Sequence, residues 1–281
     1  MESREWLYYN HAFVSALPPH QTPDTSVLHS RRFWRSSGGH ALFATWTDGF
    51  DCGSETEWWY CICDKPFDLQ ALKSKRRNVV KNALKYCTVQ IGDPLEHEEA
   101  LFAAYTEAQR SYAAVNRQEA QREAFHRSMQ RLAADDAVDV YICFIRETNE
   151  AAGYAVVKNG DGYCAFRSQK VKPSLEKYQV NAALVHAILS HYADRLGSGF
   201  YVCDGARSIN HITHFQDYLE KYFGFRKAYC RLHMYYRLPV RLGVRLLYPF
   251  RRQINKRENN RLLHQLSAVL RMEEIRRSFD G

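Results

Sequence analysis

The sequence predicts an α/β (α+β) fold in which helices flank a mixed sheet. Apolar runs typical of strands recur between longer segments of helical composition. Their order along the chain is helices, three consecutive strands, helix, strand, helix and strand, which is typical of an α/β domain with a mixed sheet. The sequence shows no internal repeat and no low-complexity segment.

The first part of the chain is expected to contribute two strands and a basic helix. Residues 1–40 are predicted to be irregular because their prolines and glycines favour turns. Strands are predicted in ALFATW (41–46) and ETEWWYCIC (55–63). Asp68 is a suitable N-cap for a helix over 69–87.

The rest of the body alternates between helices and strands. The predicted elements are two helices within 97–133, strands at VYICFIRE, AAGYAVVKN and GYCAFRSQKV, a helix from Pro173 to near Gly197, a strand at FYVCDG, a helix over 213–222 and a strand at GFRKAYCRLHMYYRL. The three consecutive strands are separated by tight turns, which predicts a meander.

The charge of the protein is concentrated at one end of the chain. Of 281 residues, 46% are hydrophobic and 25% are charged, which is ordinary for a globular protein. The net charge is +8, and residues 237–281 hold 11 Lys/Arg and 4 Asp/Glu. No apolar stretch is long enough for a membrane span and no signal peptide is visible. The sequence therefore predicts a cytoplasmic protein with a cationic tail.

The eight cysteines are predicted to be reduced core residues. Most lie within apolar strand-like runs, and the sequence has no C-x-x-C pair with a matching histidine pair at zinc spacing. Free cysteine behaves as a small buried hydrophobe, and reduced thiols fit a cytoplasmic protein. No metal site is predicted.

Three segments carry a resemblance to a known superfamily: THFQDYLEKYFGFRK, VKPSLEKYQVNAALVHAIL and LKSKRRNVVKNALKYCTVQI. Together they resemble the GNAT acyltransferase fold, in its FemAB-like branch, over residues 40–236. In the first segment, Gly224 would permit a backbone reversal and Phe225 would enter the core. The third resembles the basic helix that closes the N-terminal half of FemAB-like proteins.

The resemblance implies a mixed, splayed central sheet flanked by helices. We expect a partial N-terminal half with the basic helix at 1–95, a GNAT-like acyltransferase domain at 96–236 and a cationic amphipathic tail at 237–281. The implied reaction is transfer of an acyl or aminoacyl group to an amine, with backbone N–H groups of the splayed strand stabilising the oxyanion. The implied acceptor is an amine-bearing small molecule or an envelope precursor.

The loop that binds the CoA pyrophosphate in GNAT proteins has diverged here. The corresponding positions hold Glu176, Lys177, Gln179 and Asn181, with no glycine, and Glu176 has the wrong charge for a phosphate. Acyl-CoA, acyl-carrier protein and aminoacyl-tRNA are therefore all candidate donors. A catalytically silent module that binds tRNA or anionic lipid is the alternative.

The loop after FYVC carries the predicted catalytic residues. His211 or His214 could deprotonate the amine, and Asp204 could orient the histidine. Glu220 occupies the position where the superfamily often has a tyrosine that protonates the leaving thiolate. The same loop offers Arg207 and Asn210 for binding, although a turn with packed histidines would explain these residues equally.

Two further groups of residues are predicted to bind the donor or substrate. Lys75, Arg76, Arg77 and Lys81 lie in a helix segment without acids, which favours phosphate or tRNA as a partner, although a solvated face would look the same. Trp58, Arg167 and Gln169 could line a cleft. For Trp58, a place in the core is the competing interpretation.

The tail mixes arginines with large apolar residues. This pattern is typical of a segment that lies on an anionic membrane, here the inner face. The residues predicted to contact it are Arg241, Arg245, Leu246, Leu247, Phe250, Arg251 and Arg252. A helix packed on the protein body and an RNA-binding extension are the alternatives.

Overall fold

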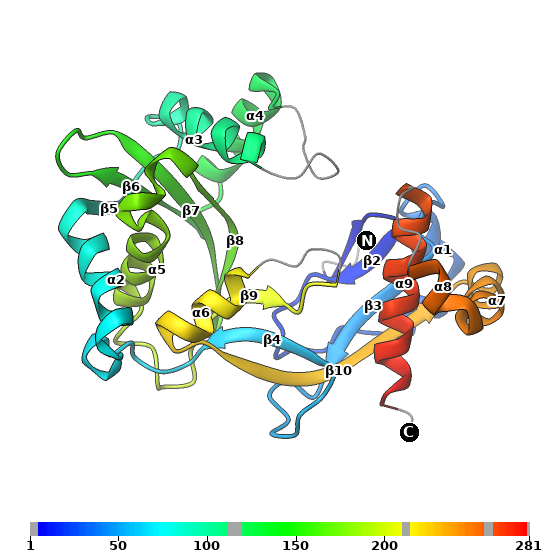
Figure 1. Ribbon diagram of the computed structural model, residues 1–281. Helices are drawn as coiled ribbons and strands as arrows, with labels where there is room; N and C mark the ends of the chain where they lie inside the picture. The colour runs from blue at the N-terminus through cyan, green and yellow to red at the C-terminus, as the bar shows by residue number, and fades with distance from the viewer. Residues whose placement is uncertain (1–4, 112–119, 210–213, 256–260, 280–281) are drawn as a thin grey trace. The chain divides into compact units, whose positions relative to one another are not determined.

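The computed structural model describes residues 5–111, 120–209, 214–255 and 261–279 (Figure 1). It is a mixed α+β fold whose sheet has the strand order β1-β2-β3-β10-β4-β9-β8-β7-β6-β5. The chain forms two compact units. The terminal unit comprises Met1–Tyr60, Ala206–Thr213 and Lys227–Gly281, and the central unit comprises Cys61–Gly205 and His214–Arg226.

The central unit contains the predicted meander. Its strands are β5 (Cys87–Ile91), β6 (Val138–Ile145), β7 (Ala151–Gly160), β8 (Tyr163–Val171) and most of β9 (Tyr201–Ala206). Strands β5 to β8 pair antiparallel in sequence order, whereas β9 runs parallel to β8. The predicted three-strand meander is therefore confirmed.

Helices cover both faces of this sheet. Helices α3 (Glu98–Ser111) and α4 (Arg122–Ala133) lie on one side, and α2 (Ser74–Tyr86) and α5 (Val180–His191) lie on the other (Figure 1). Leu101 and Phe125 pack with Ile142 and Val156 in a buried cluster between the first pair and the strands. The remaining helix of this unit is α6 (Phe215–Phe223), which ends at Gly224.

The Gly-Phe turn after α6 has the predicted form. Gly224 caps the helix at φ 70°, in the left-handed region that glycine adopts without a steric penalty. Phe225 is buried, and its ring lies 6.3 Å from that of Phe166 on β8. The turn therefore anchors the end of α6 to the central strands.

The terminal unit combines both ends of the chain. Its elements are β1 (Trp6–Tyr9), β2 (Ala12–Ser15), α1 (Arg31–Arg35), β3 (Phe43–Asp48), the start of β4 (Trp58–Cys63), nearly all of β10 (Arg226–Tyr236), α7 (Leu238–Leu247), α8 (Arg251–Asn255) and α9 (Arg261–Arg277). The three consecutive domains expected from the sequence stay a prediction. No helix in the described ranges combines the length and the hydropathy needed to cross a bilayer.

The N-terminal segment is more regular than predicted. Strands β1 and β2 form a hairpin, and Asn10 and His11 turn the chain with φ values of 45° and 63°. Turn residues with positive φ match the twist of a hairpin, and Asn is one of the residues that tolerates them. The expectation of irregular structure over 1–40 was therefore wrong for 6–15.

Two helices are shorter than predicted. Asp68 accepts a hydrogen bond from the Gln70 amide, but it caps a 3₁₀ turn, and α2 begins only at Ser74. The segment after Pro173 also starts as a 3₁₀ turn, and Gln179 then adopts φ 61°. A left-handed residue ends one helical segment before the next begins, so α5 covers only 180–191.

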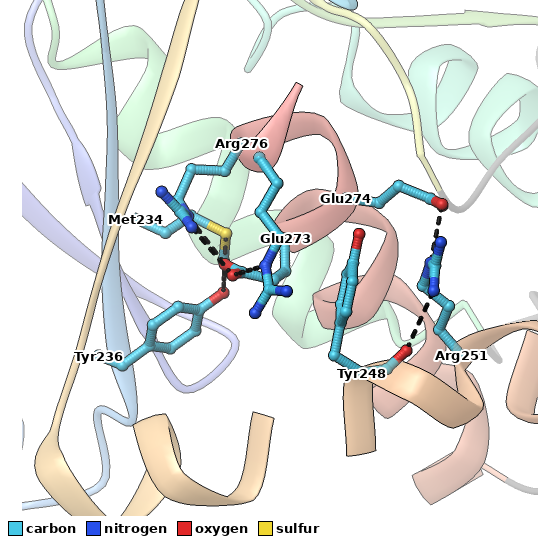
Figure 2. A network of polar contacts seen from close by, with 8 residues as sticks. Met234, Tyr236, Tyr248, Arg251, Glu273, Glu274 and Arg276 are labelled. Atoms are coloured by element: carbon cyan, nitrogen blue, oxygen red, sulfur yellow. Dashed lines mark hydrogen bonds and ion pairs between the residues drawn. The ribbon is translucent and has the colours of Figure 1, made fainter. Parts of the chain in front are cut away.

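The last helix is fastened to β10 by a buried carboxylate (Figure 2). The Glu273 side chain is only 4% exposed and accepts hydrogen bonds from Tyr236, Arg276 and Arg277 at 2.7–3.1 Å. Burial alone would raise the pKa of Glu273, but these three donors outweigh it and lower the pKa. The ionised carboxylate therefore holds α9 on the strand.

We expect Glu273→Ala to destabilise the protein by about 2–4 kcal/mol, because removing one partner of a buried ion pair leaves the other charges uncompensated. Tyr236→Phe removes one hydrogen bond and should cost only about 1 kcal/mol. Urea unfolding of both variants measures the difference. Equal losses of unfolding free energy in the two variants would show that Arg276 and Arg277 contribute little.

Candidate active site

The central feature of the candidate site is the point where β8 and β9 separate. Their parallel ladder contains Tyr163↔Tyr201, Cys164↔Val202 and Ala165↔Cys203, and within the described residues it continues no further. Both strands continue, β8 to Val171 and β9 to Ala206. The predicted splay of the central sheet is therefore present, and it leaves the β9-facing edge of 166–171 without partners from β9.

Asp204 is the first residue of β9 beyond the shared ladder. Burial raises its pKa from the ordinary value of 3.8 to about 7, although a hydrogen bond with Gln216 opposes the rise. A carboxyl group with this pKa exchanges a proton near neutral pH, as a general acid or base must. The sequence identified Asp204 but predicted only an orienting role.

Helix α6 supplies the other polar groups near Asp204. Gln216 and Glu220 are four residues apart and therefore share one helix face. Glu220 Oε1 is buried and has no hydrogen-bond partner among the described residues. The negative charges of Asp204 and Glu220 both contribute to raising the pKa of the buried Cys61 thiol, behind its burial, which is the larger cause. The carboxylates of Asp204 and Glu220 are therefore both close enough to Cys61 to affect its thiol electrostatically.

A cavity of about 780 Å³ lies between α3, α4 and the strands β7 and β8. The β8 segment that has left β9 lines it with Arg167, Ser168 and Lys170, and α4 adds Arg131. Arg167 is the extra residue of a β-bulge, because Val157 pairs with Phe166 and Val156 with Ser168. No acid is among the described residues that line it, so this lining suits an anionic group.

The connection from β8 to α5 lacks the glycines of a CoA-binding loop, as the sequence predicted. Gln179 supplies the left-handed residue, and Glu176 and Lys177 are exposed. Gln169 on β8 donates to Asn181 Oδ1 at 2.7 Å, which ties the strand to the start of the helix. Side chains therefore occupy the place where glycine would let a pyrophosphate approach the backbone.

The structure describes some of the other residues predicted for the loop 204–214 and not the rest. Asn210 and His211 lie outside the described residues. His214 has an 83% exposed side chain and lies 3.5 Å from the Asp217 carboxylate. Arg207 donates to the backbone and side chain of Glu57 in the terminal unit. Gln216, which no sequence pattern singled out, is the residue that bonds Asp204.

The remaining predicted binding residues differ in how freely they could meet a ligand. Trp58 is 7% exposed and packs in the core of the terminal unit, as the competing interpretation held. On α2, Arg76 donates to the Lys221 carbonyl and Arg77 to Gln70. The exposed cations here are the N-cap Lys73 and the three lysines of the helix, Lys75, Lys81 and Lys85.

No family model matches the sequence, and no curated protein matches it. Solved structures of similar fold include FemX, at 8% identity over 67% of this chain and 63% of that chain, with a TM-score of 0.49. The match thus spans less than two thirds of FemX. L-PGS from Bacillus licheniformis is 12% identical over 84% of this chain and 82% of that chain, with a TM-score of 0.49.

A third similar structure is the C-terminal domain of a putative lysylphosphatidylglycerol synthetase from Agrobacterium fabrum. It is 8% identical over 85% of this chain and 82% of that chain, with a TM-score of 0.47. GNAT family acetyltransferases are also among the similar structures. The element order and the separation of β8 from β9 agree with the splayed mixed sheet that the sequence predicted.

The raised pKa of Asp204 should be visible in the stability of the protein. Because the folded state keeps the Asp204 proton up to about pH 7 and the unfolded chain releases it near 3.8, wild-type stability should fall as pH rises through this window. We expect Asp204→Asn to gain about 2–3 kcal/mol relative to wild type between pH 5 and pH 8. Urea unfolding at the two pH values measures this gain, and a constant difference would contradict the assignment.

Proposed function

We propose that the protein is an acyl- or aminoacyl-transferase that forms an amide bond on an amine acceptor, with Asp204 as the general base. The observation that carries the proposal is a carboxyl group with a pKa of about 7 at the point where β8 and β9 separate. A carboxyl group with this pKa is about half deprotonated at pH 7, and its deprotonated form can accept a proton from an amine as it attacks.

The proposed reaction begins when the acceptor amine attacks the carbonyl carbon of the donor while Asp204 takes its proton. The new C–N bond forms as the carbonyl π electrons move onto oxygen. Backbone N–H groups on the edge of 166–171 that β9 does not pair would stabilise this oxyanion. Collapse of the intermediate breaks the bond to the leaving thiol or hydroxyl oxygen and re-forms the carbonyl.

Glu220 is the residue we assign to the leaving group. Its buried Oε1 atom has no hydrogen-bond partner in the described part of the chain. The resemblance to GNAT proteins gives this position to a tyrosine that protonates the leaving thiolate, and a carboxylic acid can do the same. The proton that Asp204 takes from the amine can pass through Glu220 to the leaving group, so both carboxylates return to their starting state in each turnover.

The cationic cavity supports a donor or acceptor that carries an anionic group. Arg131, Arg167 and Lys170 would bind a phosphate or carboxylate, and Tyr105 and Tyr154 add aromatic walls. Acyl-CoA, acyl-carrier protein and aminoacyl-tRNA all meet this requirement. The missing glycines between β8 and α5 favour a donor that is not held by a CoA pyrophosphate loop. An amine-bearing metabolite or envelope precursor is the proposed acceptor.

We expect purified protein to transfer a group from at least one of these three donor classes to an amine, with a rate that rises with pH through about 7. Asp204→Asn should lower kcat by about 10²–10⁴-fold and abolish this pH dependence. Mass spectrometry of the acceptor measures the transfer. Asp217→Asn, which changes an exposed aspartate, is the matched control.

His214→Ala distinguishes the proposed base from the histidine that the sequence favoured. Because His214 is exposed, this variant should retain nearly full activity. If His214→Ala is inactive and Asp204→Asn is fully active, the general base is His214 and not Asp204. If none of the three donor classes supports transfer to an amine, the proposed reaction is wrong.

A second candidate function is recognition of tRNA or another polyphosphate without catalysis. The exposed lysines of α2 favour it, because like charges at four-residue spacing destabilise a helix unless an anion offsets them. This function needs α2 but does not need Asp204. Binding would weaken linearly on a log–log plot against salt.

We expect the combined replacement of Lys73, Lys75, Lys81 and Lys85 by Gln to lower tRNA affinity and to reduce the salt slope by roughly one per lost phosphate contact. Filter binding across a salt series measures both quantities. Arg76 and Arg77 stay unchanged because they bond to other protein groups. An unchanged slope would show that α2 does not contact phosphates.

A further inference from the structure

Helix α7 presents leucines to solvent. Leu238, Leu242 and Leu246 are 61%, 53% and 72% exposed, whereas Val244 is buried. At about 100° per residue, the three leucines form one stripe roughly 80° wide, centred opposite the direction of Val244. A helix on a protein surface normally turns its polar side outward, so this arrangement is reversed. Phe250, 57% exposed, follows directly after the helix.

The charges around this stripe have one sign. Residues 237–255 contain five arginines and no acid. Arg241 and Arg245 are exposed on α7 and flank one side of the leucine stripe. Within the described residues, neither side chain has a hydrogen bond or an ion pair. An apolar stripe beside unpaired cations complements a surface that is apolar inside and anionic outside.

A cavity of about 420 Å³ lies directly beside α7. Arg241 and Arg245 line it together with Tyr235 and Tyr236 of β10 and Arg276 and Arg277 of α9. The Arg277 guanidinium lies 3.8 Å from the centre of the Tyr248 ring, which fixes this wall. Glu273 is the one acid in the lining, and hydrogen bonds from Tyr236, Arg276 and Arg277 already satisfy it.

We propose that α7 binds the surface of an anionic phospholipid bilayer. Leu238, Leu242, Leu246 and Phe250 enter the acyl region, and Arg241 and Arg245 contact headgroup phosphates at the mouth of the cavity. The cavity gives one headgroup a cationic site that Arg241 and Arg245 line. This site lies entirely in the terminal unit and is independent of the proposed transfer reaction.

Co-sedimentation of the full chain with vesicles tests the proposal. The protein should bind vesicles of equal parts phosphatidylglycerol and phosphatidylcholine, and not vesicles of phosphatidylcholine alone. Arg241→Gln with Arg245→Gln should weaken binding about 30-fold, because each cation near an anionic surface contributes a few-fold. Leu242→Ser with Leu246→Ser should weaken it about tenfold or more by removing inserted apolar area.

Matched double variants control for net charge and for exposed leucine. Arg31→Gln with Arg32→Gln removes two exposed arginines of α1, and Leu7→Ser with Leu95→Ser removes two exposed leucines. Both should bind like wild type. If the α1 variant loses as much vesicle binding as the α7 arginine variant, net charge alone explains the effect and the assignment to α7 is wrong.

Two further measurements separate the bilayer from other occupants. The fluorescence of Leu246→Trp should shift to the blue with the mixed vesicles and not with soluble glycerol phosphate. Sedimentation velocity without lipid should give the same species for wild type and Leu242→Ser/Leu246→Ser. No shift with vesicles would overturn the proposal, and so would self-association that the serine variant abolishes, because α7 would then contact a second copy.

Discussion

The end of the β8–β9 ladder after three residue pairs is the constraint on which the central unit depends. Strands that stay paired leave no free backbone groups, whereas strands that diverge leave one edge of each open. The bulge at Arg167 accompanies the divergence and changes the direction of the β8 side chains. Asp204 is the first β9 residue beyond the shared ladder, so its position follows from this geometry.

The same opening explains the chemistry of Asp204. A carboxylate among buried strands loses most of its hydration, and the single hydrogen bond from Gln216 does not restore it. The buried position of Asp204 on β9 therefore lowers the free energy of unfolding at neutral pH. Residues with such an unfavourable environment cluster at functional sites, which makes Asp204 the natural centre of the proposed transferase.

The terminal unit handles charge in two opposite ways. On α9, Glu273 is buried and matched by Arg276, Arg277 and Tyr236, so the helix is fixed to β10 (Figure 2). On α7, the arginines have no acidic partner among the described residues and the leucines face outward. Part of the cationic tail is therefore structural, as one interpretation of the sequence held, and the other part is available to a partner.

The sequence by itself determined most strands of the sheet, the meander and the Gly224–Phe225 turn, because periodicity and turn chemistry are local properties, and it singled out Asp204. It did not reveal that Gln216 bonds Asp204 or that Arg207 pairs with Glu57, 150 residues away. Only the tertiary structure decided these features, because desolvation and pairing depend on which distant segments the fold brings together.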